Sequence, residues 1–169
     1  PEGLDQRRED AGSCRSHAEK SVWTVFVEGD RRIEIMTIQE AKIIELPKFP
    51  DRRGNLSVVE EFKDIPFKIE RTYWIYDVPG GETRGGHAYR ENREFVVALS
   101  GSFDVVLDDG KEKKLFSLNR SYYGLYVPEG MWRQMRNFST NSLALVLSST
   151  KYSEGDYIRD YQEFLKLKQ

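Results

Sequence analysis

The histidine content of this chain restricts the chemistry that it can support. Among 169 residues there are two histidines, His17 and His87, and one cysteine, Cys14. A metal centre built mainly on imidazole needs about three protein ligands close together in space. His17 lies in a polar stretch far from His87 in the sequence, and no cysteine pair is available instead. We therefore expect no metal site in this protein.

His87 lies in the segment GGHAY, residues 85–89. The two preceding glycines leave room for a substrate or a second backbone to come close. With an ordinary pKa of ~6.5, an imidazole here can remove and return a proton near neutral pH. On a strand, Tyr89 shares a face with His87, and its hydroxyl can donate to a carbonyl or enolate oxygen. This pattern predicts proton abstraction next to a ketone, with a structural, hydrogen-bonded histidine as the equally weighted alternative.

Arginines and aromatic residues occur together in the strand-like part of the chain. The arginines are Arg53, Arg71, Arg84 and Arg133, and the aromatic residues are Tyr73, Trp74, Tyr123, Tyr126 and Trp132. Guanidinium groups match phosphate oxygens, and aromatic rings stack on bases, so the combination fits a nucleoside-diphosphate ligand. The competing interpretation places most of the arginines on the surface and most of the rings in the core.

Short apolar or alternating runs indicate β structure from Met36 onward. The predicted strand runs are 56–62, 67–78, 93–110, 111–118, 122–128, 132–138 and 142–150. Asp109-Gly110 predicts a hairpin, because such turns need positive φ angles, and residues 95–99, FVVAL, predict a strand covered on both faces. The pattern as a whole predicts an all-β fold, a small jelly-roll barrel. The apolar spacing of residues 157–168 predicts a C-terminal helix.

Residues 1–35 differ from the remainder of the chain because they are charged and contain few large apolar side chains. We expect this segment to be a leader or a flexible part outside the fold, and residues 36–169 to form one domain. The alternative is a genuine extra strand within SVWTVFVEG, residues 21–29.

Charge and composition exclude several classes of partner. A net charge of -2 gives no electrostatic reason to expect nucleic-acid binding. No apolar run approaches the ~20 residues that a membrane-spanning helix needs, and the N-terminus lacks the apolar core of a signal peptide. The single cysteine fits a reducing compartment. We expect a cytoplasmic protein that binds neither nucleic acid nor membrane.

Three segments, taken in order and with their spacing, are similar to one family. They are RGGHAYRENREFVVALSGSFDVVLDDG (84–110), GLYVPEGMWRQMRNFS (124–139) and LALVLSSTKYSEGDYIRDYQEF (143–164). They resemble the sugar-nucleotide ketoisomerases of the cupin superfamily, the WxcM-like dTDP-4-oxo-6-deoxyglucose 3,4-ketoisomerases of bacterial surface-polysaccharide synthesis. The resemblance implies a homodimeric jelly roll with strands contributed across the interface. It also implies a dTDP-linked 4-keto sugar whose carbonyl moves from C4 to C3 through an enediolate, without metal or other cofactor.

The resemblance also implies roles for individual residues. His87 matches the first histidine of the family's R-G-x-H-x-H motif and is the expected base. Tyr89 replaces the second histidine, so either its hydroxyl relays the proton, or the chemistry is retuned, or the protein binds without turnover. Tyr73 matches the tyrosine of the R-x-Y-x-I strand that begins at Arg71. We expect the two tyrosines to orient or stabilise the enediolate and Arg71 to bind an anionic group.

The resemblance implies that the remaining predicted site residues contact the substrate. Arg53 and Arg133 match family positions whose identity is associated with the C4 configuration of the product, and their combination here does not decide which epimer forms. Arg84 and Tyr126 complete the expected substrate-binding set. Two alternatives to the isomerase stay open, a related sugar-nucleotide epimerase and a non-catalytic sugar-nucleotide binding module.

Overall fold

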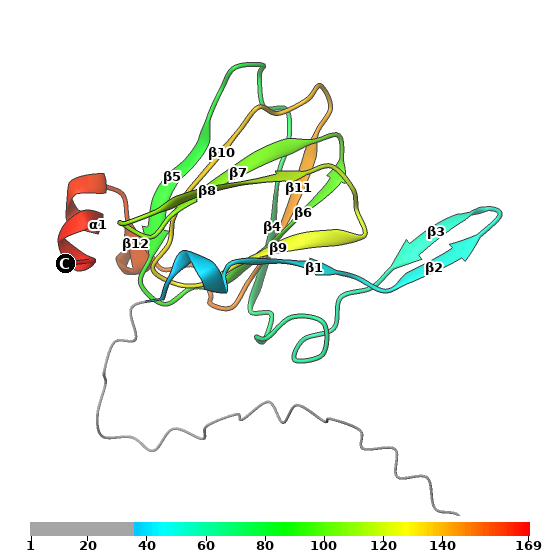
Figure 1. The fold of residues 1–169 in the computed structure, drawn as a ribbon. Helices are drawn as coiled ribbons and strands as arrows, with labels where there is room; N and C mark the ends of the chain where they lie inside the picture. The colour runs from blue at the N-terminus through cyan, green and yellow to red at the C-terminus, as the bar shows by residue number, and fades with distance from the viewer. Residues whose placement is uncertain (1–35) are drawn as a thin grey trace, which may run out of the picture. The chain divides into compact units, whose positions relative to one another are not determined.

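The computed structural model describes residues 36–169, so the predicted leader at 1–35 lies outside the described residues. Two five-stranded antiparallel sheets lie face to face (Figure 1), in the orders β1-β9-β6-β11-β4 and β12-β5-β10-β7-β8. Apolar side chains from both sheets fill the space between them. This architecture confirms the predicted all-β jelly roll.

The elements are short, as the turn spacing predicts. The strands are β1 Lys42–Glu45, β2 Lys48–Asp51, β3 Gly54–Ser57, β4 Arg71–Ile75, β5 Arg84–Tyr89, β6 Glu94–Ser100, β7 Phe103–Asp108, β8 Lys113–Leu118, β9 Tyr123–Val127, β10 Trp132–Arg136, β11 Leu143–Ser148 and β12 Tyr157–Ile158, with helix α1 at Tyr161–Leu167 and single 3₁₀ turns at Ile38–Glu40 and Glu154–Asp156. The predicted run 93–110 forms two strands, because Gly101 adopts a positive φ of 65° and turns the chain between them. Among the described residues, no helix has the length and apolar character needed to cross a membrane.

Strand β6 lies in the middle of the first sheet, between β9 and β11. Val96 and Ala98 face the space between the sheets. Phe95 and Val97 face the opposite side, where the loop at 58–70 covers them with Ile65 and Phe67. All four strand residues are buried. The prediction that this strand is covered on both faces is therefore confirmed for residues 95–98, whereas Leu99 at the end of the run is exposed.

The C-terminal segment differs from the prediction of one continuous helix over 157–168. Tyr157 and Ile158 form β12, which adds to the edge of β5 and places Tyr157 opposite Tyr89. The helix begins only after Asp160, whose carboxylate accepts a hydrogen bond of 2.8 Å from the backbone N–H of Glu163. Phe164 on this helix is buried against the second sheet. The outcome is that Tyr157 lies on a strand beside β5.

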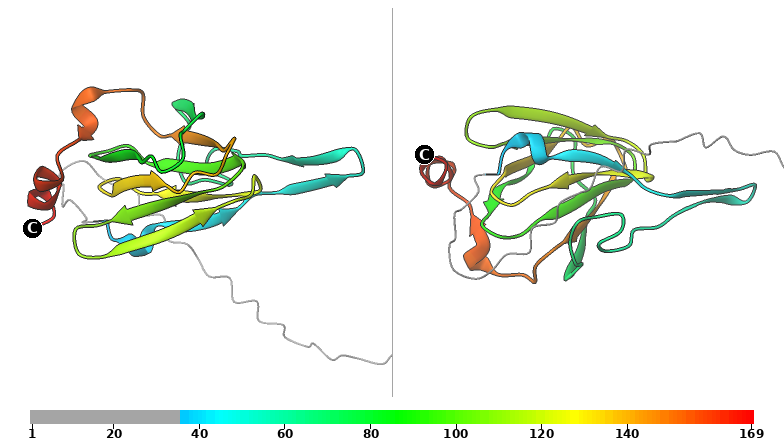
Figure 2. Two further views of the ribbon diagram at one scale, coloured as in Figure 1. Left: turned by 90° about the horizontal axis from the view of Figure 1, so that it is seen from above. Right: turned by 60° about the horizontal axis from the view of Figure 1, so that its bottom comes forward.

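Strands β2 and β3 form a hairpin that pairs with itself and with neither of the two large sheets of the described chain. It extends away from the sandwich in both figures (Figures 1 and 2). All eight of its residues are exposed. They include Phe49 and Leu56, a directly paired apolar couple across the two strands.

Candidate active site

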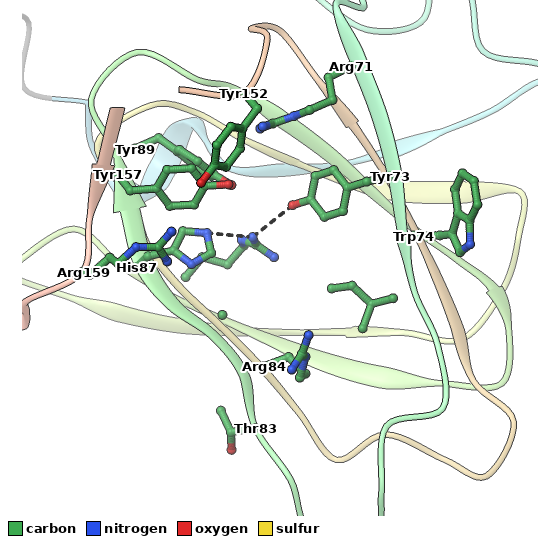
Figure 3. A pocket seen from close by; sticks show the side chains of 13 residues that line it. Arg71, Tyr73, Trp74, Thr83, Arg84, His87, Tyr89, Tyr152, Tyr157 and Arg159 are labelled. Carbon is green, nitrogen blue, oxygen red and sulfur yellow. Dashed lines mark hydrogen bonds between the residues drawn. The ribbon is translucent and has the colours of Figure 1, made fainter. Parts of the chain in front are cut away.

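A cavity of about 550 Å³ opens between the sheets, where β4 forms the edge of one and β5 with β12 forms the edge of the other. Figure 3 shows tyrosines and arginines converging on it from these strands. Six of the eight predicted site residues line it: Arg71, Tyr73, Arg84, His87, Tyr89 and Arg133. The sandwich thus brings together side chains from β4, β5 and β10 that lie up to about 60 residues apart in the chain.

The glycines before His87 allow β5 and β10 to approach closely at this point. Gly85 has a φ of 89°, and a Cβ atom there would lie 2.9 Å from the carbonyl oxygen of Arg133. The pairing of the two strands shifts register between Arg133 and Gln134. This irregularity places His87 directly opposite Arg133. The sequence predicted that the glycine pair leaves room for a substrate or a second backbone. At Gly85 the close neighbour is the backbone of Arg133.

Arg133 connects the base to a buried carboxylate. Its Nη2 atom lies 3.0 Å from Nε2 of His87 and donates to the Tyr73 hydroxyl over 3.3 Å (Figure 3). The Tyr73 hydroxyl donates in turn to Oε1 of Glu94 at 2.7 Å. Nε of Arg133 and Oε2 of Glu94 lie 3.0 Å apart as an ion pair, although their alignment does not make a hydrogen bond. Glu94 and Arg133 are 1% and 2% exposed, so this pair of charges is removed from water.

His87 is held in its neutral form. A guanidinium group only donates hydrogen bonds, so Nε2 accepts and the proton resides on Nδ1. Burial, followed by the positive charges of Arg133, Arg159 and Arg71, lowers the pKa of His87 to about 3. At neutral pH the imidazole is therefore uncharged, with a lone pair on Nε2 that accepts from Arg133, and the neutral ring is the form that a general base requires.

The lowered pKa of His87 makes stability depend on pH. The unfolded chain binds a proton on this imidazole below pH ~6.5, whereas the folded chain resists it until about pH 3, so acid favours unfolding within this window. Between neutral pH and about pH 5, we expect the wild type to lose about 2 kcal/mol more unfolding free energy than the variant His87→Asn. Urea unfolding at both pH values measures this difference. Equal losses in the two proteins would contradict the lowered pKa.

The structure places Tyr89 beside His87, as the sequence predicted. The two rings meet edge to face, with centroids 4.9 Å apart. The Tyr89 hydroxyl donates to the hydroxyl of Tyr157 at 3.1 Å. Burial raises the pKa of Tyr89 well above its ordinary value, and the nearby charge of Glu94 raises it further. Tyr89 is therefore a neutral hydroxyl in this cavity and not a tyrosinate.

The sequence analysis missed the contribution of the C-terminal segment. Tyr152, Tyr157 and Arg159 line the cavity together with the predicted residues (Figure 3). The guanidinium of Arg159 lies 4.2 Å from the centre of the Tyr157 ring. The signal in the sequence was the density of tyrosines in YSEGDYIRDY, and the helical interpretation of 157–168 placed the second of them on a helix.

Two predicted site residues lie elsewhere in the described chain. Arg53 is on the β2–β3 hairpin, where its exposed side chain pairs with Asp51 at 2.8 Å. Tyr126, on β9, packs against Phe67 on the far side of the first sheet. Burial raises its pKa to about 12. Neither residue lines the cavity of its own chain.

The charges of the cavity favour an anionic ligand. Arg71, Arg84, Arg133 and Arg159 line it, whereas Glu94 lies beneath it, paired with Arg133. Within residues 36–169, no three histidine, cysteine, aspartate or glutamate side chains gather as metal ligands would. The site therefore offers a neutral imidazole, tyrosine hydroxyls and several guanidinium groups, a set suited to proton transfer on a phosphorylated or nucleotide-linked substrate.

Comparison with known proteins gives consistent matches over the described residues. Residues 39–169 match the family described as "FdtA: WxcM-like, C-terminal". A TDP-4-oxo-6-deoxy-alpha-D-glucose-3,4-oxoisomerase from Aneurinibacillus thermoaerophilus is 43% identical over 127 residues, which cover 75% of this chain and 91% of that protein.

Two crystal structures show the same architecture. A 3,4-ketoisomerase from Helicobacter canadensis is 44% identical, with a TM-score of 0.74 over 76% of this chain and 96% of that one. The sugar 3,4-ketoisomerase QdtA from Thermoanaerobacterium thermosaccharolyticum, in complex with TDP, is 34% identical, with a TM-score of 0.75 over 78% of this chain and 96% of that one.

Proposed function

We propose that this chain, which belongs to the WxcM-like FdtA family, moves the carbonyl of a TDP-linked 4-keto-6-deoxyhexose from C4 to C3 in sugar biosynthesis. The relatives named for this activity match this chain over nearly their whole length. The observation that carries the proposal is the neutral imidazole of His87 inside an arginine-lined cavity. We place the reaction in the cytoplasm, in keeping with the single cysteine of the chain.

His87 moves the carbon-bound proton in this reaction. Its Nε2 lone pair, released from Arg133 when substrate enters, takes the proton from C3, and the electrons of that bond form the C3=C4 double bond. The C4 carbonyl oxygen becomes negative, and the Arg133 guanidinium stabilises it. The O3 proton moves to O4, C3 becomes the carbonyl, and the imidazolium returns its proton to C4. No atom is gained or lost, and no external oxidant or reductant is needed.

The remaining arginines bind the diphosphate. Arg71, Arg84 and Arg159 all line the cavity, and each guanidinium can donate to phosphate oxygens of one extended ligand. Trp74 lies at the same rim with 59% of its surface exposed, so its ring is available to stack on the base. A bound dianion also raises the pKa of His87 toward the working range, because negative charge favours the imidazolium.

Incubation with TDP-4-keto-6-deoxyglucose in heavy water, followed by NMR, tests the proposed function. We expect deuterium at C3 of recovered substrate and at C4 of a new 3-keto product, because His87 exchanges its proton with solvent between the two steps. Deuterium at C5 instead would identify an epimerase. Substrate that binds but gains no deuterium would identify a binding module and would overturn the isomerase.

We also propose that the protein works as a homodimer in which the β2–β3 hairpin packs on a second copy of the chain. A two-stranded hairpin is at best marginally stable alone in water. This one exposes Phe49 and Leu56, each with more than half of its surface accessible. A second copy that covers these side chains would also receive Arg53, which lies next to them on the same hairpin.

Mixing two inactive variants tests whether Arg53 serves the partner's site. We expect Arg53→Ala and His87→Asn each to lose activity, because one lacks an anion contact and the other lacks the base. After the two are mixed and allowed to exchange subunits, one site of each mixed dimer contains both residues, so about a quarter of wild-type activity should return. No recovery of activity, or a monomer in sedimentation equilibrium, would contradict the proposal that the hairpin packs on a second copy of the chain.

A further inference from the structure

Tyr157 and Tyr89 form a hydroxyl pair next to the base. Their strands are register partners at this point, and the two hydroxyl oxygens lie 3.1 Å apart. Their ring centres lie 5.1 Å and 4.9 Å from that of His87, so both rings contact the imidazole. Figure 3 shows them together on the His87 side of the cavity, opposite Tyr73.

The other tyrosines of the cavity have their protons engaged elsewhere. Tyr73 donates to Glu94 at 2.7 Å, and Tyr152 donates to Glu154 at 2.6 Å. Tyr89 and Tyr157 bond to each other instead, so one hydroxyl proton of the pair is available to a ligand in the cavity. The Arg159 guanidinium over the Tyr157 ring and the pairing of β12 with β5 keep the pair in place.

We infer that Tyr157 is a catalytic residue that, together with Tyr89, relays the hydroxyl proton of the keto sugar from O3 to O4. The inference rests on the proposed function and adds to it a residue outside the R-G-x-H-x-H segment. O3 and O4 sit on neighbouring carbons and are separated by about the length of a hydrogen bond. Two hydroxyls at a similar separation can therefore bridge them in a closed ring of four oxygens.

The relay balances without a charged tyrosine. The O3 proton passes to the Tyr89 oxygen, the Tyr89 proton passes to Tyr157 along the hydrogen bond between them, and the Tyr157 proton passes to O4. Three O–H bonds break and three form, and both side chains end as neutral hydroxyls. Burial raises the pKa of Tyr89, which disfavours a tyrosinate, and this transfer needs none. His87 keeps the separate task of moving the proton from C3 to C4.

The variant Tyr157→Phe separates the two proton transfers. It removes one oxygen atom and keeps the ring under Arg159. In heavy water we expect product formation to fall by about 10- to 100-fold, while deuterium still enters C3 of recovered substrate at close to the wild-type rate and KM stays unchanged. The reason is that His87 can still remove and return the C3 proton, whereas the hydroxyl proton no longer passes from O3 to O4.

Two further variants make the test specific. Tyr89→Phe should show the same separation, and the double variant should be no slower than either single variant, because both residues belong to one relay. Tyr161→Phe is the matched control, since this tyrosine lies on the same C-terminal segment but bonds to Asp108 outside the cavity. We expect it to retain wild-type rates of both exchange and product formation.

The possible outcomes distinguish this inference from the proposed function. Unchanged product formation in Tyr157→Phe, or a proportional loss of exchange and product formation, would overturn the relay while the isomerase stands. A wild-type protein that shows neither exchange nor product would overturn the proposed function itself. A ratio of exchange to product formation that rises in Tyr157→Phe and Tyr89→Phe, and not in Tyr161→Phe, supports the relay.

Discussion

Replacing His87 with asparagine is expected to lower ketoisomerase activity by about 10²- to 10⁴-fold and to abolish deuterium entry at C3. Asparagine retains a polar group of similar size facing Arg133 but has no lone pair able to accept a proton from carbon. Within residues 36–169, His87 supplies the only imidazole. Rates of product formation and of isotope exchange, both followed by NMR, measure the loss.

Nucleotide binding provides the control for His87→Asn. The arginines that are proposed to hold the diphosphate are unchanged in this variant, so calorimetry should give TDP affinity within a few-fold of wild type. Because kcat/KM reports ionisation in the free enzyme, the wild type should also keep its kcat/KM well below pH ~6.5, in line with the lowered pKa of the imidazole. Exchange at C3 that persists in His87→Asn would assign the base to another residue.

Replacing Glu94 with glutamine is expected to destabilise the fold by about 3–5 kcal/mol. The change keeps the shape of the side chain and an acceptor for Tyr73 but removes the negative charge that faces Arg133 at 3.0 Å. Arg133 is 2% exposed and cannot turn to water, so its charge is left buried without compensation. Urea unfolding at neutral pH measures the difference.

A second variant identifies the cause of that loss. In Glu94→Gln/Arg133→Met the buried positive charge is removed as well, so we expect stability to recover by at least about 1 kcal/mol relative to Glu94→Gln. Activity should stay low, because the guanidinium that contacts both His87 and Tyr73 is gone. A double variant no more stable than the single one would show that the ion pair is not the source of the effect.

Local patterns of the sequence correctly predicted the scaffold and the face on which the base lies. The wholly apolar run at 95–99 identified a strand that is covered on both sides over residues 95–98, and the turn at Asp109-Gly110 identified the hairpin between β7 and β8. The alternation of side chains on a strand placed His87 and Tyr89 on one face. These features depend on near neighbours in the chain, and periodicity therefore reveals them.

Contacts between distant segments set the properties of the site. His87 is neutral with a pKa of about 3 because folding buries it and places Arg133, from a strand about 46 residues away, against its Nε2 atom. Tyr157 reaches the cavity because β12 pairs with β5, a pairing that the helical spacing of the C-terminal segment concealed. Burial and the charges of residues distant in the chain produce no periodic pattern in a sequence. Only the tertiary structure therefore shows the ionisation state of the base and the second hydroxyl beside it.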